Sequence, residues 1–87
     1  MPPDPLKTLG QRVRTHRESL RDDAGRPISQ ERFGDLIGLH RTYIGHVERG
    51  EVNVSLRNLI MISDGLGVDL GELVRCLGSV PPGTKRT

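Results

Sequence analysis

The segment Gln30–Arg49, QERFGDLIGLHRTYIGHVER, has the pattern of two short helices joined by a tight turn. Its apolar residues recur three or four positions apart within each half, which gives each half one apolar helical face. These residues are Phe33 and Ile37 in the first half and Ile44 and Val47 in the second. Gly38 can adopt the positive φ that ends the first helix, and Gly34 has no side chain to hold the second helix at a distance. We predict one helix over 30–37 and a second that begins after Leu39 and ends at Arg49.

The outward face of the second predicted helix is rich in hydrogen-bond donors. It carries one acid, Glu48, among Arg41, Thr42, Tyr43, Gly45, His46 and Arg49. A helix that enters the major groove of DNA needs such donors for bases and phosphates. An ordinary helical hairpin in a small bundle has similar apolar periodicity, but it does not explain this concentration of donors. The pattern favours a DNA-reading helix.

Length and composition predict one small all-α domain. The chain has 87 residues, and a domain of this size buries a modest core unless a second copy adds area. The only aromatic residues are Phe33 and Tyr43, and β-branched runs are scarce. The formal net charge is only +2, but Arg12, Arg14 and Arg17 lie in a six-residue window without an acid. A clustered basic face indicates a nucleic-acid partner better than the net charge does.

The composition also argues against other classes of protein. Cys76 is the only cysteine, so no disulfide can form within the chain, which fits a reducing cytoplasm. No segment approaches the roughly 20 apolar residues of a membrane span, and no signal peptide begins the chain. There is no glycine-rich phosphate loop, and the histidines at 16, 40 and 46 lack metal-type spacing with carboxylates. We therefore expect no catalytic residue, metal, cofactor or membrane partner.

Residues before the central segment predict a long helix and a loop. Asp4 can cap a helix over 5–20, because Pro5 tolerates the first helical position. The inward residues of this helix are Leu6, Leu9, Val13 and Leu20. Gly10 costs about 1 kcal/mol relative to alanine in a helix, so we expect another element to pack closely against it. Residues 21–27, RDDAGRP, are polar and contain Gly and Pro, which predicts a loop.

Two further capped helices are predicted after the central segment. Ser55 can cap a helix over 56–66. Its buried line is expected to be Leu56, Leu59, Ile62 and Leu66. Asp69 opens the last helix, which we expect to end at Gly78, and Asp69 and Glu72 have the spacing of a capping box. The apolar face of that helix is Leu73, Val74 and Leu77.

From Leu9 to Val74 the chain resembles helix-turn-helix regulators of the Cro and phage-repressor type, the XRE family. The resemblance is carried by LGQRVRTHR, ISQERFGDLIGL, VERG and SLRNLIMISDGLGVDLGEL. GLHRTYIG, VERG and NVSL look especially similar to the controller proteins of restriction–modification systems, although the 21–27 loop is longer than usual and Val54 stands where proline is commoner. The resemblance implies a five-helix, lambda-repressor-like domain over 5–78 with flexible tails at 1–4 and 79–87.

Base contacts are predicted from Arg41, Thr42 and His46, which match the base-contacting positions of that family. Arg41 can donate two hydrogen bonds to O6 and N7 of guanine, a pairing worth about 1–3 kcal/mol of discrimination. The alternative for Arg41 is a solvated side chain. Thr42 can meet a thymine methyl or a phosphate, and Gly45 should leave room for DNA to approach.

Phosphate contacts are predicted mainly at helix N-termini, where free amides and the helix dipole attract anions. Gln30 begins one helix, and Asn53 and Ser55 lie at the start of another. Tyr43 has two alternatives, a phosphate contact through its hydroxyl or packing against the preceding helix. The weaker candidates are Arg14, Arg49 and Arg57. Such contacts set the register on DNA without reading sequence.

The resemblance also implies an ion pair between Arg17 of the first helix and Glu48 near the end of the third. Glu48 would then hold the recognition helix in place without touching DNA, which would explain the lone acid on that helix.

These observations predict a sequence-specific, double-stranded DNA-binding transcriptional regulator in the bacterial cytoplasm, associated with the nucleoid. We expect a homodimer on a pseudo-palindromic operator, with half-sites about one helical turn apart and RNA polymerase as a further partner at a promoter. The expected dimer surface is Ile60, Met61, Leu70, Val74 and Leu77, with Cys76 beside it. A controller role is favoured, and the alternatives are a general repressor, an antitoxin, or a protein-interaction module that has lost DNA binding.

Overall fold

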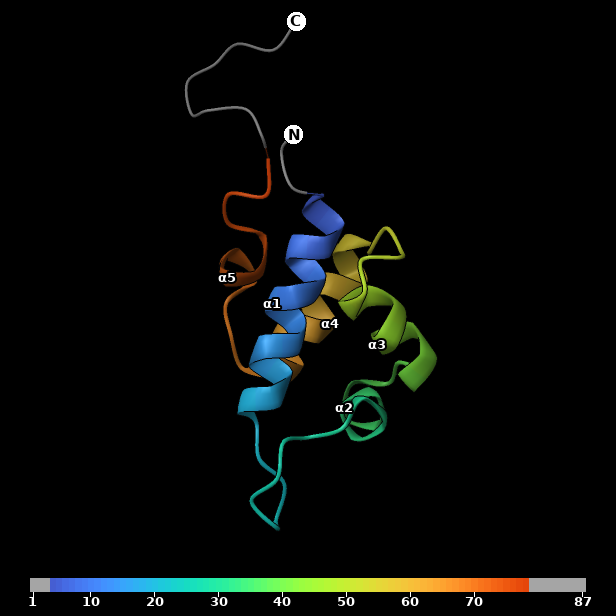
Figure 1. Ribbon diagram of the computed structural model, residues 1–87, viewed down its shortest axis with the longest axis vertical. Coiled ribbons are helices and arrows are strands. Elements are labelled where there is room, and N and C mark those ends of the chain that lie inside the picture. The colour runs from blue at the N-terminus through green and yellow to red at the C-terminus, as the bar shows by residue number, and fades with distance from the viewer. Residues whose placement is uncertain (1–3, 79–87) are drawn as a thin grey trace, which may run out of the picture.

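The structure is a computed structural model that describes residues 4–78 as five α-helices (Figure 1). The helices are α1 (Pro5–Ser19), α2 (Gln30–Ile37), α3 (Arg41–Glu48), α4 (Leu56–Leu66) and α5 (Leu70–Val74). The described residues contain no β-strand, only an isolated bridge between Arg21 and Pro27 at the base of the predicted loop. The all-α prediction is therefore confirmed. The tails predicted at 1–4 and 79–87 lie outside the described residues, apart from Asp4.

Helix α1 lies at the centre of the arrangement of α3, α4 and α5 (Figure 1). It contacts α3, α4 and α5, while α2 contacts α3 and α4. Figure 1 shows α3 and α5 on opposite sides of α1. Every helix contributes to one apolar core, which consists of Leu9, Val13, Ile28, Phe33, Ile44, Val47, Ile62, Leu66 and Leu73. Because α3 lies at the edge of this core, one of its faces is left for solvent or a partner.

The helix starts follow from local capping chemistry. The side chains of Asp4, Ser29 and Ser55 accept hydrogen bonds from the amides of Leu6, Arg32 and Asn58 at 2.9, 3.0 and 3.1 Å. Each bond satisfies an amide that has no partner within its helix. The capping box predicted at Asp69 is wrong in detail, because the Asp69 carboxylate accepts from the Gly71 amide at 3.0 Å instead.

The predicted end of the last helix is wrong. Helix α5 ends at Val74 instead of continuing to Gly78, and Cys76 has a φ of 58°, in the left-handed region. The Arg12 guanidinium donates to the carbonyls of Leu73 and Arg75 at 3.1 and 2.6 Å. These carbonyls would otherwise accept the next helical bonds, so a contact from α1 favours ending the helix here.

Two smaller predictions also need correction. Helix α1 ends at Ser19, and the Leu20 carbonyl accepts from the amide of Ile28 at 3.0 Å across the base of the loop. Leu56, expected in the buried line of α4, is 64% exposed. Helical side chains lean toward the N-terminus, so the first residue of α4 projects beyond the end of the helix.

None of the helices described between residues 4 and 78 is long and apolar enough to cross a membrane.

Candidate nucleic-acid interface

The turn between α2 and α3 is fixed by two glycines. Gly38 has a φ of 79°, and its amide and that of Leu39 both donate to the Gly34 carbonyl, at 2.8 and 3.0 Å. A Cβ at Gly34 would lie against the Leu39 carbonyl oxygen and 3.3 Å from the Arg41 amide nitrogen. The predicted close approach at Gly34 is therefore present, and it occurs at the turn that leads into α3.

The backbone of α3 also lies directly against α1. A Cβ at Gly10 would meet the carbonyl oxygens of Val47 and Glu48, the second at 2.5 Å. Since neither backbone oxygen can rotate away, only glycine fits at this crossing. The close packing predicted at Gly10 is confirmed, and it sets the distance between α1 and the C-terminal end of α3.

A buried ion pair joins Arg17 of α1 to Glu48 of α3. The side chains of both are nearly enclosed, with 7% of Arg17 and 9% of Glu48 exposed. Arg17 Nε donates to Glu48 Oε2 at 2.6 Å, and Arg17 Nη2 donates to Glu48 Oε1 at 3.0 Å. The predicted pair is thus present with bidentate geometry. Its hydrogen bond to Glu48 raises the pKa of the Arg17 guanidinium above its ordinary value, against the opposing effect of burial.

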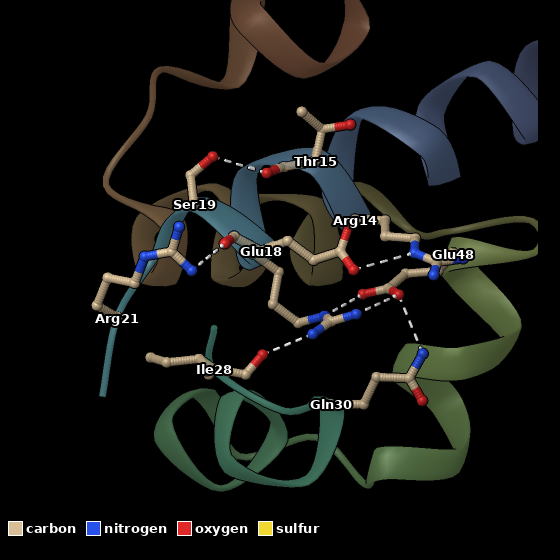
Figure 2. Close-up of polar contacts among 9 residues, drawn as sticks. Arg14, Thr15, Glu18, Ser19, Arg21, Ile28, Gln30 and Glu48 are labelled. Atoms are coloured by element: carbon tan, nitrogen blue, oxygen red, sulfur yellow. Dashed lines mark hydrogen bonds and ion pairs between the residues drawn. The ribbon is translucent and has the colours of Figure 1, made fainter. Parts of the chain in front are cut away.

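Two further groups complete this cluster (Figure 2). Arg17 Nη1 donates to the Ile28 carbonyl at 2.5 Å, and the Gln30 carboxamide Nε2 donates to Glu48 Oε1 at 3.0 Å. The cluster of Arg17, Glu48, Gln30 and the Ile28 carbonyl therefore links α1, the start of α2 and the end of α3. Sequence reasoning missed the role of the Gln30 side chain, because only the folded arrangement brings it to Glu48.

The three predicted base readers lie along α3. Arg41 and Thr42 are exposed in its first turn, and His46 is half-buried one turn later. His40 caps the helix by accepting from the Thr42 amide at 3.0 Å. The exposed Arg41 side chain is paired with an acid, since its Nη1 lies 2.6 Å from Glu31 Oε2.

A second acid faces the other end of α3. Glu51 Oε1 lies 2.9 Å from His46 Nδ1 and 2.9 Å from Arg49 Nε. The hydrogen bond from His46, followed by that from Arg49, lowers the pKa of the Glu51 carboxyl below its ordinary value. The carboxylate is therefore ionised at neutral pH. Sequence reasoning assigned no site role to Glu31 or Glu51. Glu31 lies in the first turn of α2, and Glu51 lies shortly after the predicted end of α3.

The contacts of Tyr43 and the space beside Gly45 differ from the simplest prediction for each residue. Tyr43 packs against the core, and its hydroxyl accepts from Asn58 Nδ2 at 3.0 Å, so its polar partner lies in α4 instead of α2. The space expected beside Gly45 is filled, because a Cβ there would lie 3.0 Å from Arg49 Nη1 and 3.3 Å from Gln30 Oε1. In the free protein Gly45 makes room for these two side chains.

The remaining phosphate candidates fall into two groups. Asn53, Ser55 and Arg57 are exposed around the start of α4. Arg14 is exposed on α1, where it pairs with Glu18 at 3.5 Å. The Ser55 hydroxyl is already used as the α4 cap, and the Gln30 side chain is already used by Glu48.

The predicted dimer residues lie on α4, α5 and the segment after it. Ile60 is 44% exposed, whereas Met61, Leu70, Val74 and Leu77 are half-buried. Val74 and Leu77 pack against the edge of the core. Leu36 on α2 is more exposed than any of them, at 59%, and was not predicted as an interface residue. In the described part of the chain, no group of three His, Cys, Asp or Glu side chains is arranged to hold a metal ion.

Five helices around one core, with a glycine turn that presents a donor-rich third helix, define a lambda-repressor-like helix-turn-helix protein. Residues 26–73, more than half of the chain, match the family described as Helix-turn-helix. The chain belongs to this helix-turn-helix family.

Particular relatives narrow the likeness. The chain is 47% identical over 47 residues to the control protein C.SmaI of Serratia marcescens, an alignment that covers 54% of this chain and 56% of that protein. The chain thus spans little more than half the length of this curated relative. The controller protein C.AhdI from Aeromonas hydrophila has a similar structure, with a TM-score of 0.67 and 41% identity over 78% of this chain and 90% of that one. The P22 c2 repressor, solved in complex with a synthetic operator, gives a TM-score of 0.66 and 27% identity over 77% and 92% of the two chains. The resemblance to restriction–modification controllers is therefore confirmed.

Proposed function

We propose that the chain is a restriction–modification controller that binds a pseudo-palindromic operator as a homodimer, with α3 of each subunit in successive major grooves. Half-sites would then lie about one helical turn apart, roughly 34–36 Å. The observation that carries this proposal is the buried bidentate pair of Arg17 and Glu48, which fixes the end of α3 against α1. A recognition helix held in this way keeps its donors in a constant position relative to the rest of the domain.

Base reading is assigned to Arg41, Thr42 and His46. The exposure of Arg41 and Thr42 in the first turn of α3 supports this assignment, since N-terminal residues of a recognition helix are the ones that meet base edges. The Arg41 fork suits guanine, whose O6 and N7 both accept hydrogen bonds.

Backbone contacts would fix the register of the domain on DNA. We assign phosphates to the exposed groups around the start of α4 and, for α2, to the backbone amide of Gln30, because the Gln30 side chain is bonded to Glu48. The full set proposed to face phosphates is Gln30, Tyr43, Arg49, Asn53, Ser55, Arg57 and Arg14. The Tyr43 hydroxyl accepts a hydrogen bond from Asn58, which leaves its own proton for a phosphate oxygen.

Dimerisation would use Ile60, Met61, Leu70, Val74 and Leu77. The exposed Ile60 side chain and the modest core of so short a domain support this surface. RNA polymerase would be the further partner at a promoter, where the bound dimer activates or represses transcription of nearby genes. The proposal includes no catalytic step, and it locates the protein with the nucleoid in the cytoplasm.

Selection from random duplexes tests this function directly. We expect the selected sequences to contain two related half-sites of opposite orientation, and sedimentation to find two chains per duplex. The logarithm of the affinity should fall linearly with the logarithm of the salt concentration as phosphate counterions are released. A shallow salt slope without any selected sequence would instead indicate a protein-interaction module. Genes for a methyltransferase and an endonuclease beside the coding sequence would separate a controller from a general repressor or an antitoxin.

A further inference from the structure

The basic side chains on the proposed DNA-reading surface already contact carboxylates of the protein itself. Glu31 lies 2.6 Å from Arg41, and Glu51 is shared by His46 and Arg49 at 2.9 Å each. Neither acid belongs to α3, because Glu31 is in the first turn of α2 and Glu51 follows the end of α3. Two separate segments thus bring negative charge to the recognition helix, Glu31 near its start and Glu51 near its end.

Stability does not account for these acids. The side chains of Arg41 and Glu31 are 62% and 61% exposed, and those of Arg49 and Glu51 are 55% and 49% exposed. Exposed ion pairs contribute little to folding, since water screens the charges and ordering two long side chains costs entropy. On a surface that meets the DNA polyanion, however, each carboxylate repels the phosphates that would approach its cation.

We propose that Glu31 and Glu51 are specificity-determining residues that weaken binding to random duplex more than binding to the operator. This inference rests on the proposed function. The difference arises from the charge of the group that approaches. A phosphate is an anion and must either displace the carboxylate or sit beside it, whereas a base edge carries no net charge.

The geometry at Arg41 allows a base contact while the ion pair remains. Glu31 occupies Nη1, so Nε and Nη2 are left for other acceptors, and these two nitrogens form one edge of the guanidinium fork. Guanine O6 and N7 match such a pair of parallel donors. Glu31 therefore also orients Arg41, and a specific complex can form without breaking the contact.

His46 follows the same logic at the other end of α3. Its Nδ1 lies 2.9 Å from a Glu51 carboxylate oxygen, a distance that requires a hydrogen on this nitrogen. The remaining ring nitrogen, Nε2, is then the one available to an uncharged base edge. Because His46 and Arg49 lower the pKa of Glu51, this acid keeps its negative charge at neutral pH.

The test compares Glu31→Gln, Glu51→Gln and the double variant with unaltered protein. Fluorescence anisotropy would give the affinity of each for the selected operator and for a random duplex of equal length, over a series of salt concentrations. Asp64→Asn is the matched control, because Asp64 is an exposed acid on α4 and its loss changes the net charge equally. Circular dichroism melts would show that every variant is folded.

We expect each glutamine variant to bind random duplex about two- to fivefold more tightly, as estimated from the strength of exposed ion pairs. Operator affinity should change less, so the ratio of specific to non-specific affinity should fall. Each cation released to a phosphate should steepen the salt slope on random duplex by about one unit, and Asp64→Asn should leave the slope unchanged.

An unchanged ratio, or operator and random duplex tightening equally, would overturn the inference while leaving the proposed function intact. Unaltered protein that prefers no sequence at all would overturn the proposed function and this inference together. A fall in the ratio as large for Asp64→Asn as for Glu31→Gln would also overturn it, because the effect would then come from net charge and not from the pairing of Arg41.

Discussion

Replacement of Glu48 by alanine tests whether this residue holds α3 or reads DNA. In the folded protein the carboxylate accepts three hydrogen bonds, two from Arg17 and one from Gln30. Glu48→Ala would leave the guanidinium of Arg17, a residue that is only 7% exposed, with the Ile28 carbonyl as its remaining partner. An uncompensated buried charge of this kind costs about 3–5 kcal/mol.

That cost is large relative to the stability of the whole domain. At about 0.05–0.15 kcal/mol per residue, a chain of this length is stabilised by roughly 4–13 kcal/mol. We therefore expect Glu48→Ala to lose a large part of its folding stability in urea titrations followed by circular dichroism. The molecules that remain folded at low temperature should keep the wild-type order of preference among operator variants.

Two further variants serve as controls for the loss of the buried ion pair. Glu18→Ala removes a carboxylate that pairs with exposed Arg14 at 3.5 Å, and it should cost no more than about 1 kcal/mol. Replacing both Arg17 and Glu48 by apolar residues of similar volume should restore much of the stability, since no buried charge is then unpaired. The structural role would be refuted if Glu48→Ala had the same stability in urea as the wild-type protein but an altered operator preference.

Three further substitutions probe the crossing, the reading face and the dimer surface. Gly10→Ala places a methyl group 2.5 Å from a backbone oxygen of α3. We expect a net loss of stability in thermal melts, because an overpacking cost of about 1–3 kcal/mol exceeds the gain in helix propensity. Equal or higher stability would contradict the close crossing. Arg41→Ala should relax base preference at one position of each half-site by about 1–3 kcal/mol, whereas Arg57→Ala should weaken all sequences alike and reduce the salt slope, as binding to a panel of single-base operator variants would show. Ile60→Glu should give a monomer in sedimentation without loss of helix content, while Leu36→Glu, on the exposed face of α2, should remain a dimer; the reverse result would move the interface to α2.

Features governed by neighbouring residues in the chain were predictable from sequence. The caps at Asp4, Ser29 and Ser55 and the positive φ of Gly38 follow from chemistry within three residues of each position. The close approaches at Gly10 and Gly34 were also predictable, because glycine within a helix has few other reasons to be there. The ion pair of Arg17 and Glu48 came from the family resemblance and not from the spacing of the two residues.

Features governed by tertiary contacts were not predictable. The end of α5 is associated with Arg12, which lies more than sixty residues earlier and bonds to the carbonyls of Leu73 and Arg75. The acids beside the reading face escaped prediction for a similar reason. Glu31 looks like an ordinary first-turn acid, and only the angle of the turn after α2 brings it to Arg41.

Two arginines of α1 bond to other helices, so the geometry of α1 sets the distance and angle between those helices. Arg12 binds carbonyls at the end of α5, and Arg17 binds Glu48 at the end of α3. They are five positions apart, which corresponds to an axial rise of about 7.5 Å and about 1.4 turns. In the proposed dimer, the pitch of α1 therefore sets the offset between α5, which contacts the other subunit, and α3, which contacts the DNA groove. A single inserted residue between these arginines would rotate one attachment by about 100° relative to the other, and the operator spacing that suits the dimer would change with it.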